Sequence, residues 1–217
     1  MIMEYQMNII NGYPLAEIDG GLFLLDTGCP VTFAEPKIKE INMDGFLLRP
    51  MSATPSQLRQ IELAVGMHIN GVIGFDTVRK FGNVLCDKAK MTMTFGAEIR
   101  DGVVVPFKND LHFNIKVNDK DARAFLDTGA PNMMADNHDL LDKSRYVGMV
   151  DEYSFSGLLK LEGYKGTAEF GGVRTELTML KSGSDIMRDG SDVYFSPDVF
   201  AKEFYMINWD ERKVIFK

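Results

Sequence analysis

The chain has 217 residues, with 31 acidic against 24 basic side chains and a formal net charge of −7. This length fits one large domain or two small lobes, and the acidic balance disfavours nucleic acids and anionic membranes as partners. No apolar run approaches the roughly 18 residues of a membrane-spanning helix, and the N-terminus lacks the basic start and apolar core of a signal peptide. We therefore expect a globular, cytoplasmic protein that binds neither nucleic acid nor membrane.

The first half opens with a predicted hairpin. Residues 15–18 and 22–25 are apolar strands around an Asp-Gly-Gly turn at 19–21. The second strand runs directly into residues 26–30, which read Asp-Thr-Gly-Cys-Pro. The sequence thus places an aspartate in a tight turn at the end of a buried strand.

The rest of the first half predicts short elements. Thr54 and Pro55 are typical of a helix start, and Gly66 is typical of its end. The other expected elements are a brief helix at 35–41, an extended segment at 44–50, an apolar strand ending in Gly74, a short helix at 76–81 capped by Asp76, and a hairpin at 84–95.

The second half repeats this order. Strands at 113–117 and 122–126 precede residues 127–131, which read Asp-Thr-Gly-Ala-Pro. The two aspartates are 101 positions apart (127 − 26). A short helix at 197–204 and a hairpin at 205–216 are expected to close the second half as 76–95 closes the first. The repeat predicts a duplicated scaffold with one aspartate from each copy.

A pair of facing carboxyl groups has a specific chemistry. Two like charges about 3 Å apart cannot both ionise, so their pKa values separate and the pair shares one proton. One group can then take a proton from a water while the other donates a proton to a substrate carbonyl. The threonine hydroxyl can bond backbone across the pair, and the glycine permits a tight turn close to the carboxylates.

The two Asp-Thr-Gly phrases, each after an apolar strand, resemble those of the aspartic peptidases of the pepsin and retropepsin group. The resemblance implies an all-β, two-lobed acid-protease β-barrel fold with pseudo-twofold symmetry and a few short helices. The lobes would be residues 1–100 and residues 101–217, the latter with a flap insertion. It also implies an aspartic endopeptidase that acts on a peptide or protein substrate without cofactor or metal. Because one chain carries both aspartates, we expect a monomer.

Roles follow residue by residue from this resemblance. The catalytic pair would be Asp26 and Asp127. The supporting positions would be the hydroxyl and turn residues that follow them: Thr27, Gly28, Thr128 and Gly129. Gly74 matches a second landmark of the family, at which a glycine lies close to the catalytic loop. Ser196 stands at the equivalent place in the second half and departs from the pattern.

The second half is the longer one. The stretch from Asp127 to Asp210 is 83 residues against 61 from Asp26 to Asp87, about 22 more. We expect the additional residues to include a glycine-rich hairpin that serves as a single flap, with Tyr153 and Phe155 contacting substrate. The alternative is that both aromatic residues are ordinary strand residues of a surface hairpin.

Two other functions remain open from the sequence. The same cleft could form a non-catalytic, retropepsin-like peptide-binding or sensor module. Cys29, next to the first Asp-Thr-Gly, could be a nucleophile, but no motif places a histidine to activate it. We expect Cys29 and Cys86 to be reduced thiols, because their spacing fits no zinc motif. The three histidines are isolated in the sequence.

Overall fold

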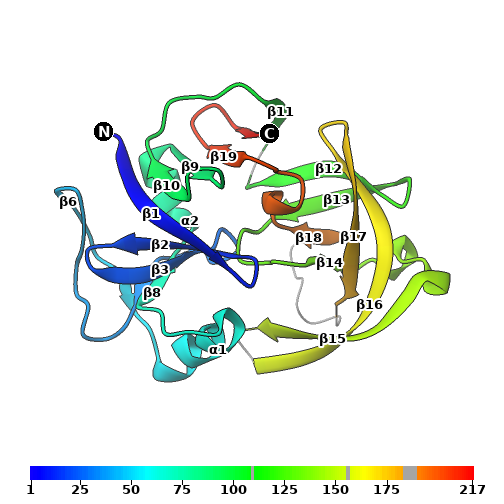
Figure 1. The fold of residues 1–217 in the computed structure, drawn as a ribbon, viewed down its shortest axis with the longest axis horizontal. Helices are drawn as coiled ribbons and strands as arrows, with labels where there is room; N and C mark the ends of the chain where they lie inside the picture. Colours follow the sequence, from blue (N-terminus) through cyan, green and yellow to red (C-terminus); the bar gives the residue numbers. More distant parts are fainter. Residues whose placement is uncertain (109, 155–156, 183–189) are drawn as a thin grey trace.

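The computed structural model describes residues 1–108, 110–154, 157–182 and 190–217. Within these residues most of the regular structure is β, arranged in an eleven-stranded, a seven-stranded and a two-stranded sheet (Figure 1). The all-β expectation is therefore confirmed. None of the helices in the described part of the chain has the length and apolar character needed to cross a membrane.

The eleven-stranded sheet contains strands from both ends of the chain, in the spatial order β11-β20-β19-β9-β10-β1-β2-β3-β8-β4-β7. Its strands are β1 (Met3–Ile10), β2 (Tyr13–Ile18), β3 (Gly21–Leu25), β4 (Phe33–Ala34), β7 (Met51–Ser52), β8 (Gly71–Ile73), β9 (Asn83–Asp87), β10 (Thr92–Phe95), β11 (Val103–Pro106), β19 (Phe204–Asn208) and β20 (Lys213–Phe216). A separate hairpin pairs β5 (Ile41–Met43) with β6 (Phe46–Leu48).

The seven-stranded sheet belongs to the second half alone, in the order β12-β13-β18-β14-β17-β16-β15. Its strands are β12 (His112–Val117), β13 (Lys120–Leu126), β14 (Met133–Ala135), β15 (Tyr146–Ser154), β16 (Gly157–Phe170), β17 (Val173–Lys181) and β18 (Val193–Phe195). An additional pairing joins β12 to β16, so the sheet closes on itself. Three 3-10 turns accompany it: η1 (His138–Leu140), η2 (Lys143–Arg145) and η3 (Pro197–Val199).

One five-strand arrangement occurs twice. In the first half β2 pairs antiparallel with β3, β3 parallel with β8, β8 antiparallel with β4, and β4 parallel with β7. In the second half β12, β13, β18, β14 and β17 pair in the same order with the same directions. The repeat seen in the sequence thus corresponds to a repeated topology, as expected for a pseudo-twofold fold.

The hairpin strands follow from alternation of apolar and polar residues. In β12 the side chains of Phe113, Ile115 and Val117 are buried, whereas Asn114 and Lys116 are exposed. This period of two is what one buried sheet face requires. Both hairpins that lead to the Asp-Thr-Gly turns are therefore confirmed.

Helix α1 (Pro55–Val65) has the predicted ends. The Thr54 hydroxyl accepts a bond from the Gln57 N–H while the Gln57 side chain accepts from the Thr54 N–H, which forms a capping box. Gly66 closes the helix with a φ of 84°, a left-handed conformation that favours glycine. The expected helix at 35–41 is wrong, since the structure assigns no helix there and Ile41 already begins β5.

The other two predicted helices need correction. Helix α2 (Phe75–Phe81) begins one residue early, with Gly74 rather than Asp76 at its N-cap. The Asp76 carboxylate instead accepts the Thr32 N–H at 2.8 Å. At residues 197–204, where a helix was expected, the structure has the short turn η3, and Phe204 already lies in strand β19.

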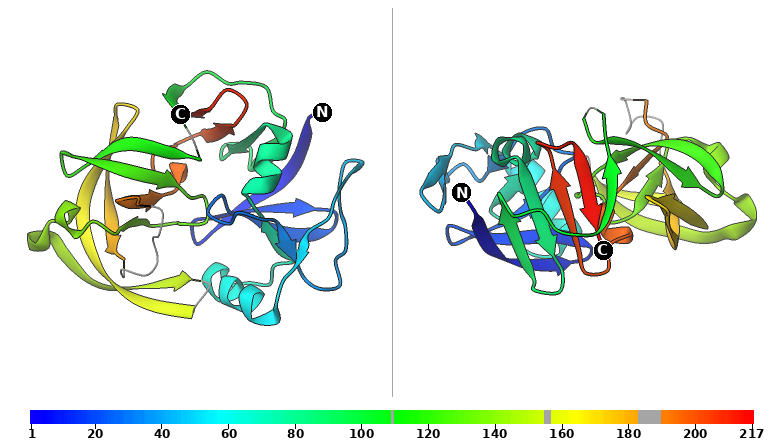
Figure 2. Two further views of the ribbon diagram at one scale, coloured as in Figure 1. Left: turned by 180° about the vertical axis from the view of Figure 1, so that it is seen from behind. Right: turned by 90° about the horizontal axis from the view of Figure 1, so that it is seen from above.

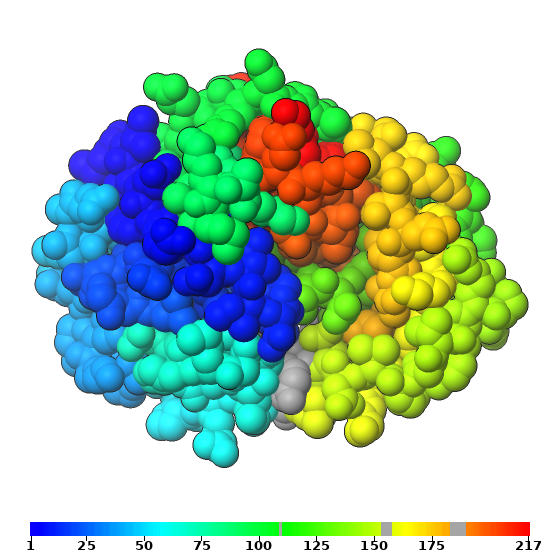
Figure 3. All heavy atoms as spheres, viewed as in Figure 1, coloured from blue at the N-terminus to red at the C-terminus, as the bar shows by residue number. Residues whose placement is uncertain are grey.

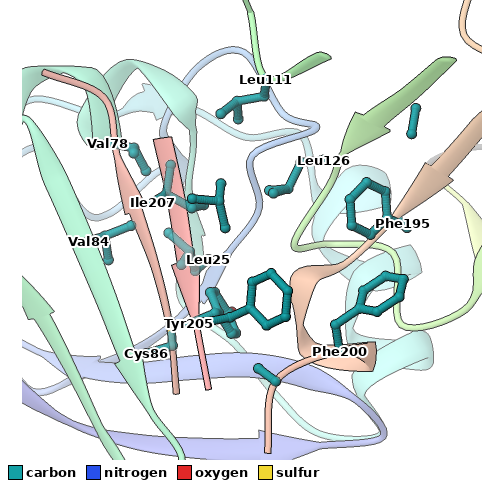
Figure 4. Close-up of a cluster of buried hydrophobic side chains, with 14 of the residues drawn as sticks. Leu25, Val78, Val84, Cys86, Leu111, Leu126, Phe195, Phe200, Tyr205 and Ile207 are labelled. Carbon is teal, nitrogen blue, oxygen red and sulfur yellow. The ribbon is translucent and has the colours of Figure 1, made fainter. Parts of the chain in front are cut away.

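The closing strands of the two halves share one sheet. β9 of the first half pairs antiparallel with β19 of the second. Figure 2 shows the red C-terminal strands beside the green strands of the first half, and Figure 3 shows the red and orange C-terminal residues at the seam between the halves. Buried side chains from both halves, among them Leu25, Leu126, Phe195 and Ile207, form one continuous core (Figure 4). The halves are thus joined by backbone pairing and by apolar packing.

Candidate active site

Two turns meet at the centre of the molecule. Asp26 follows β3, and its N–H donates to the carbonyl of Ile73 at 3.0 Å. Asp127 follows β13, and its N–H donates to the carbonyl of Phe195 at 2.8 Å. Each aspartate is therefore held by the end of the neighbouring parallel strand, β8 or β18. The two predicted catalytic residues occupy equivalent places in the repeated topology.

The threonines bond across the two turns. The backbone N–H of Thr27 donates to Thr128 Oγ1 at 3.0 Å, and the backbone N–H of Thr128 donates to Thr27 Oγ1 at 3.0 Å. The Thr27 hydroxyl donates in turn to the carbonyl of Leu126 at 3.0 Å, and that of Thr128 to the carbonyl of Leu25 at 2.9 Å. All four bonds are buried and reciprocal, so they fix the position of one turn relative to the other.

The glycines allow the aspartates to approach the opposite turn. A Cβ on Gly28 would lie 2.4 Å from Asp127 Oδ2, and a Cβ on Gly129 would lie 2.5 Å from Asp26 Cγ. Either contact is too close for a side chain. The backbone N–H groups of Gly28 and Gly129 instead donate to Asp127 Oδ1, at 3.2 and 2.8 Å. Glycine is needed here because the backbone itself contacts the facing carboxylate.

The two carboxyl groups perturb one another. Burial raises the pKa of Asp26 well above its ordinary value, and the charge of Asp127 and a hydrogen bond with it raise that pKa further. Burial also raises the pKa of Asp127, against the opposing effects of hydrogen bonds from Asp26 and from the N–H groups of Gly129 and Gly28. The pair therefore favours a state in which one proton is retained between the two groups.

A pocket of about 170 Å³ opens above the aspartates; we call it the dyad pocket. Helix α1 packs against β15 (Figure 1). Residues of α1 and of the β15–β16 hairpin line two sides of the pocket. Its described lining residues are Tyr13, Leu24, Asp26, Gly28, Gln60, Ile61, Ala64, Asp127, Gly129, Ala130, Met134, Glu152 and Leu159. Carboxyl groups and mostly apolar side chains thus line one cleft.

Three polar residues of this region were not predicted. Glu152 of β15 is buried, and Asn132 Nδ2 donates to its Oε2 at 2.8 Å. Tyr13 of β2 lines the same pocket as Glu152. Burial, followed by the charges of Glu152, Asp26 and Asp127, raises the pKa of Tyr13. The only sequence signal was the place of Asn132 directly after Ala130-Pro131; nothing local marked Glu152 or Tyr13.

The second landmark differs between the halves for a visible reason. A Cβ on Gly74 would lie 2.5 Å from the carbonyl carbon of Val31, so glycine is required there. Ser196 at the equivalent place is fully buried, and its Oγ accepts the N–H of Asp198 as the cap of η3. The serine therefore fits the second half without breaking its pattern.

Cys29 is buried beside the first turn, and its thiol donates to the carbonyl of Val31 at 3.1 Å. Burial, followed by the charge of Asp26, raises the pKa of this thiol to about 12. A protonated thiol is a poor nucleophile, so the site gives no support to thiol chemistry. Among the described residues, no group of three or more His, Cys, Asp or Glu side chains suits a metal ion.

The two aromatic residues expected in a flap lie mostly outside the described structure. The backbone of Tyr153 lies in β15, paired with Leu158, while its side chain and the whole of Phe155 lie outside the described residues. Near this end of the hairpin, Glu152 and Leu159 line the dyad pocket. The hairpin is therefore beside the aspartates, and the substrate contacts of Tyr153 and Phe155 stay predictions.

Comparison with known proteins shows likeness of fold. No protein-family model matches the chain, and no curated protein matches it in sequence. Basic 7S globulin from soybean is 12% identical with a TM-score of 0.57, and the match covers 100% of this chain and 94% of that chain. The aspartic proteinase from Irpex lacteus is 9% identical with a TM-score of 0.57, covering 99% and 96%. The protease of simian foamy virus (mac) is 17% identical with a TM-score of 0.31, covering 41% and 89%. The two full-length matches show that the chain has a pepsin-like aspartic proteinase fold.

Proposed function

We propose that this protein is an aspartic endopeptidase that hydrolyses peptide bonds with a water molecule activated between Asp26 and Asp127. The observation that carries the proposal is the pair of hydrogen-bonded carboxyl groups with raised pKa values at the floor of a pocket. Buried, mutually perturbed acids in a cleft are what general acid–base chemistry requires. The pepsin-like fold supports the same conclusion.

The surroundings of the two acids support different roles for them in the free protein. Asp127 Oδ1 accepts two backbone N–H groups, which stabilises its anion, whereas Asp26 Oδ1 accepts one, from Cys29, and Asp26 is the more deeply buried of the two acids. Asp127 would take a proton from the water as the oxygen of that water bonds to the peptide carbonyl carbon, while Asp26 gives its proton to the carbonyl oxygen. The tetrahedral adduct then breaks its C–N bond as Asp127 gives the proton it took from the water to the departing nitrogen, and Asp26 takes back a proton from a hydroxyl of the adduct.

The geometry also supports the wider proposal. An extended peptide would lie in the dyad pocket between α1 and the β15–β16 hairpin, with the hairpin as the single flap. Residues 1–100 and 101–217 would act as the two lobes. Both carboxyl groups come from one chain, so a monomer would be active. No metal or cofactor would be required, because the two acids supply both proton transfers.

The test is digestion of a mixed peptide library across pH by the wild type, Asp26→Asn and Asp127→Asn. We expect a bell-shaped, acidic pH profile for the wild type, because the rate needs one protonated and one ionised group. Each variant should lose about 10³-fold or more of the rate. Asp101→Asn removes an exposed carboxylate and should leave the rate unchanged. An active Asp26→Asn protein, or a rate that rises steadily to alkaline pH, would refute the proposal.

A second candidate is a non-catalytic peptide-binding or sensor module. One of the two full-length structural neighbours is named as a globulin rather than as a proteinase. The module would bind peptides and a statine-type transition-state mimic without cleaving any library member. Calorimetric binding of the mimic together with library digestion therefore separates the two functions.

A further inference from the structure

We infer that Glu152 selects peptides that carry a lysine or arginine side chain close to the bond that is cut. This inference rests on the proposed function, since it assigns a substrate class to the same dyad pocket. It concerns a residue of the β15–β16 hairpin, which is separate in the chain from both Asp-Thr-Gly turns.

The Glu152 carboxylate is held in a defined place. Its side chain is buried with 6% of the residue exposed, although β15 is an edge strand of its sheet. Asn132, just past the second catalytic turn, donates to Oε2 at 2.8 Å, and Tyr13 of the first half lines the pocket beside it. Because these residues come from separate elements, the carboxylate is oriented before any ligand binds.

The charge of the pocket is unbalanced. The described lining residues include three carboxylic acids, Asp26, Asp127 and Glu152, and no lysine or arginine. Buried carboxylates are stabilised by a nearby cation. A ligand with a positive group is therefore the electrostatic complement of this pocket.

The walls suit a basic side chain of some length. Leu24, Ile61, Ala64, Met134 and Leu159 supply apolar surface around the carboxylate. Lysine and arginine have aliphatic stems that bury along apolar surface while the charged end reaches a polar partner. The dyad pocket thus offers both parts of such a site, an apolar channel and a fixed anion.

The first test uses the wild-type protein alone. Short peptides with a central reduced-amide bond, which cannot be hydrolysed, carry either lysine or norleucine at each flanking position in turn. Norleucine keeps the aliphatic stem and lacks the amine. At one position we expect the lysine peptide to bind at least about tenfold more tightly by calorimetry, because its amine meets a desolvated carboxylate. Equal affinities at every position would overturn the inference.

The second test assigns the preference to Glu152. Glu152→Gln keeps the shape and hydrogen-bonding capacity of the side chain and removes its charge, so the lysine preference should fall to about twofold or less. Asp151→Asn removes the same charge from the adjacent, exposed residue, whose carboxylate lies 3.4 Å from Lys160 at the surface, and should keep the full preference. An undiminished preference in Glu152→Gln would overturn the assignment.

The outcomes separate this inference from the proposed function. If lysine peptides bind preferentially through Glu152 but no peptide is cut, the inference stands and the endopeptidase proposal fails. If peptides are cut without any preference for a basic residue, the endopeptidase proposal stands and the inference fails. The calorimetric measurement needs no catalysis, and circular dichroism of each variant verifies its fold.

Discussion

Thr27 and Thr128 each donate a backbone N–H to the side-chain hydroxyl of the other, and both bonds are 3.0 Å long. Each hydroxyl also donates to a carbonyl at the end of the opposite strand, Leu126 or Leu25. Each threonine follows an aspartate in the sequence and bonds to the other half of the chain. The positions of the two aspartates thus depend on the side chains of Thr27 and Thr128.

This network predicts the effect of Thr128→Ala. The change leaves the N–H of Thr27 and the carbonyl of Leu25 buried without these partners, which should cost about 2–5 kcal/mol of unfolding free energy. Urea denaturation followed by circular dichroism measures the loss. Thr128→Ser keeps the hydroxyl and should cost less. A Thr128→Ala protein within about 0.5 kcal/mol of wild type would show that the network does not stabilise the fold.

The raised pKa of Asp26 predicts how stability depends on pH. The native state binds this proton more tightly than the unfolded chain, whose aspartates titrate near about 3.9. Its stabilising contribution is therefore complete below about that pH and is lost as the pH rises through the raised native pKa, by up to about 1.4 kcal/mol per pH unit. Asp26→Asn should make this slope smaller in urea unfolding measured from pH 3 to pH 8, while the buried Asp127 keeps its own contribution. Parallel curves for the two proteins would contradict the assignment.

The close approach at Gly129 predicts a loss of activity without a comparable loss of fold. In Gly129→Ala the new methyl group would lie 2.5 Å from Asp26 Cγ, so the turn and the carboxyl group must separate. A shift of about 1 Å at reacting groups can cost roughly 100-fold in rate. Peptide hydrolysis and thermal unfolding should be measured together on the same variant. Wild-type activity in Gly129→Ala would show that the spacing of the dyad is not critical.

Cys29 provides a test of mechanism class. Its counterpart in the second half is Ala130, and both residues are buried beside their turns. Cys29→Ala should therefore retain activity within about threefold, with a stability cost of about 1 kcal/mol for the smaller side chain. Hydrolysis rates of the wild type and of Cys29→Ala on the same peptide give this comparison. Complete loss of activity in Cys29→Ala would instead favour a thiol mechanism.

Much of the fold could be predicted because local patterns and the repeat agreed. Alternating burial in β12, the cap at Thr54 and the glycine after α1 are short-range signals, and the structure confirms them. The prediction of a helix at 35–41 was wrong because a proline alone does not specify a helix start. The segment before β5 instead bonds locally, through the N–H of Ile38 to the carbonyl of Glu35 at 2.9 Å.

The candidate site was predictable only where its residues follow one another in the chain. Each Asp-Thr-Gly turn is a local motif, so the aspartates and their supporting threonines could be named. Tyr13, Asn132 and Glu152 come together from separate elements, β2, the second turn and β15, and no spacing in the sequence reports that proximity. Similarly, the sequence marks Ser196 only as a departure from the glycine of the family pattern, because its role as the N-cap of η3 depends on the fold.

The shared sheet has a consequence for how a ligand could enter. Five residue pairs join β9 to β19 across the two halves, and the apolar core is continuous beneath them. A hinge motion that separates the two halves would break these strand pairs and expose that core to solvent. For the proposed peptide substrate, access to the two aspartates would therefore require the outer β15–β16 hairpin to move, since it borders the cleft at the edge of its own sheet.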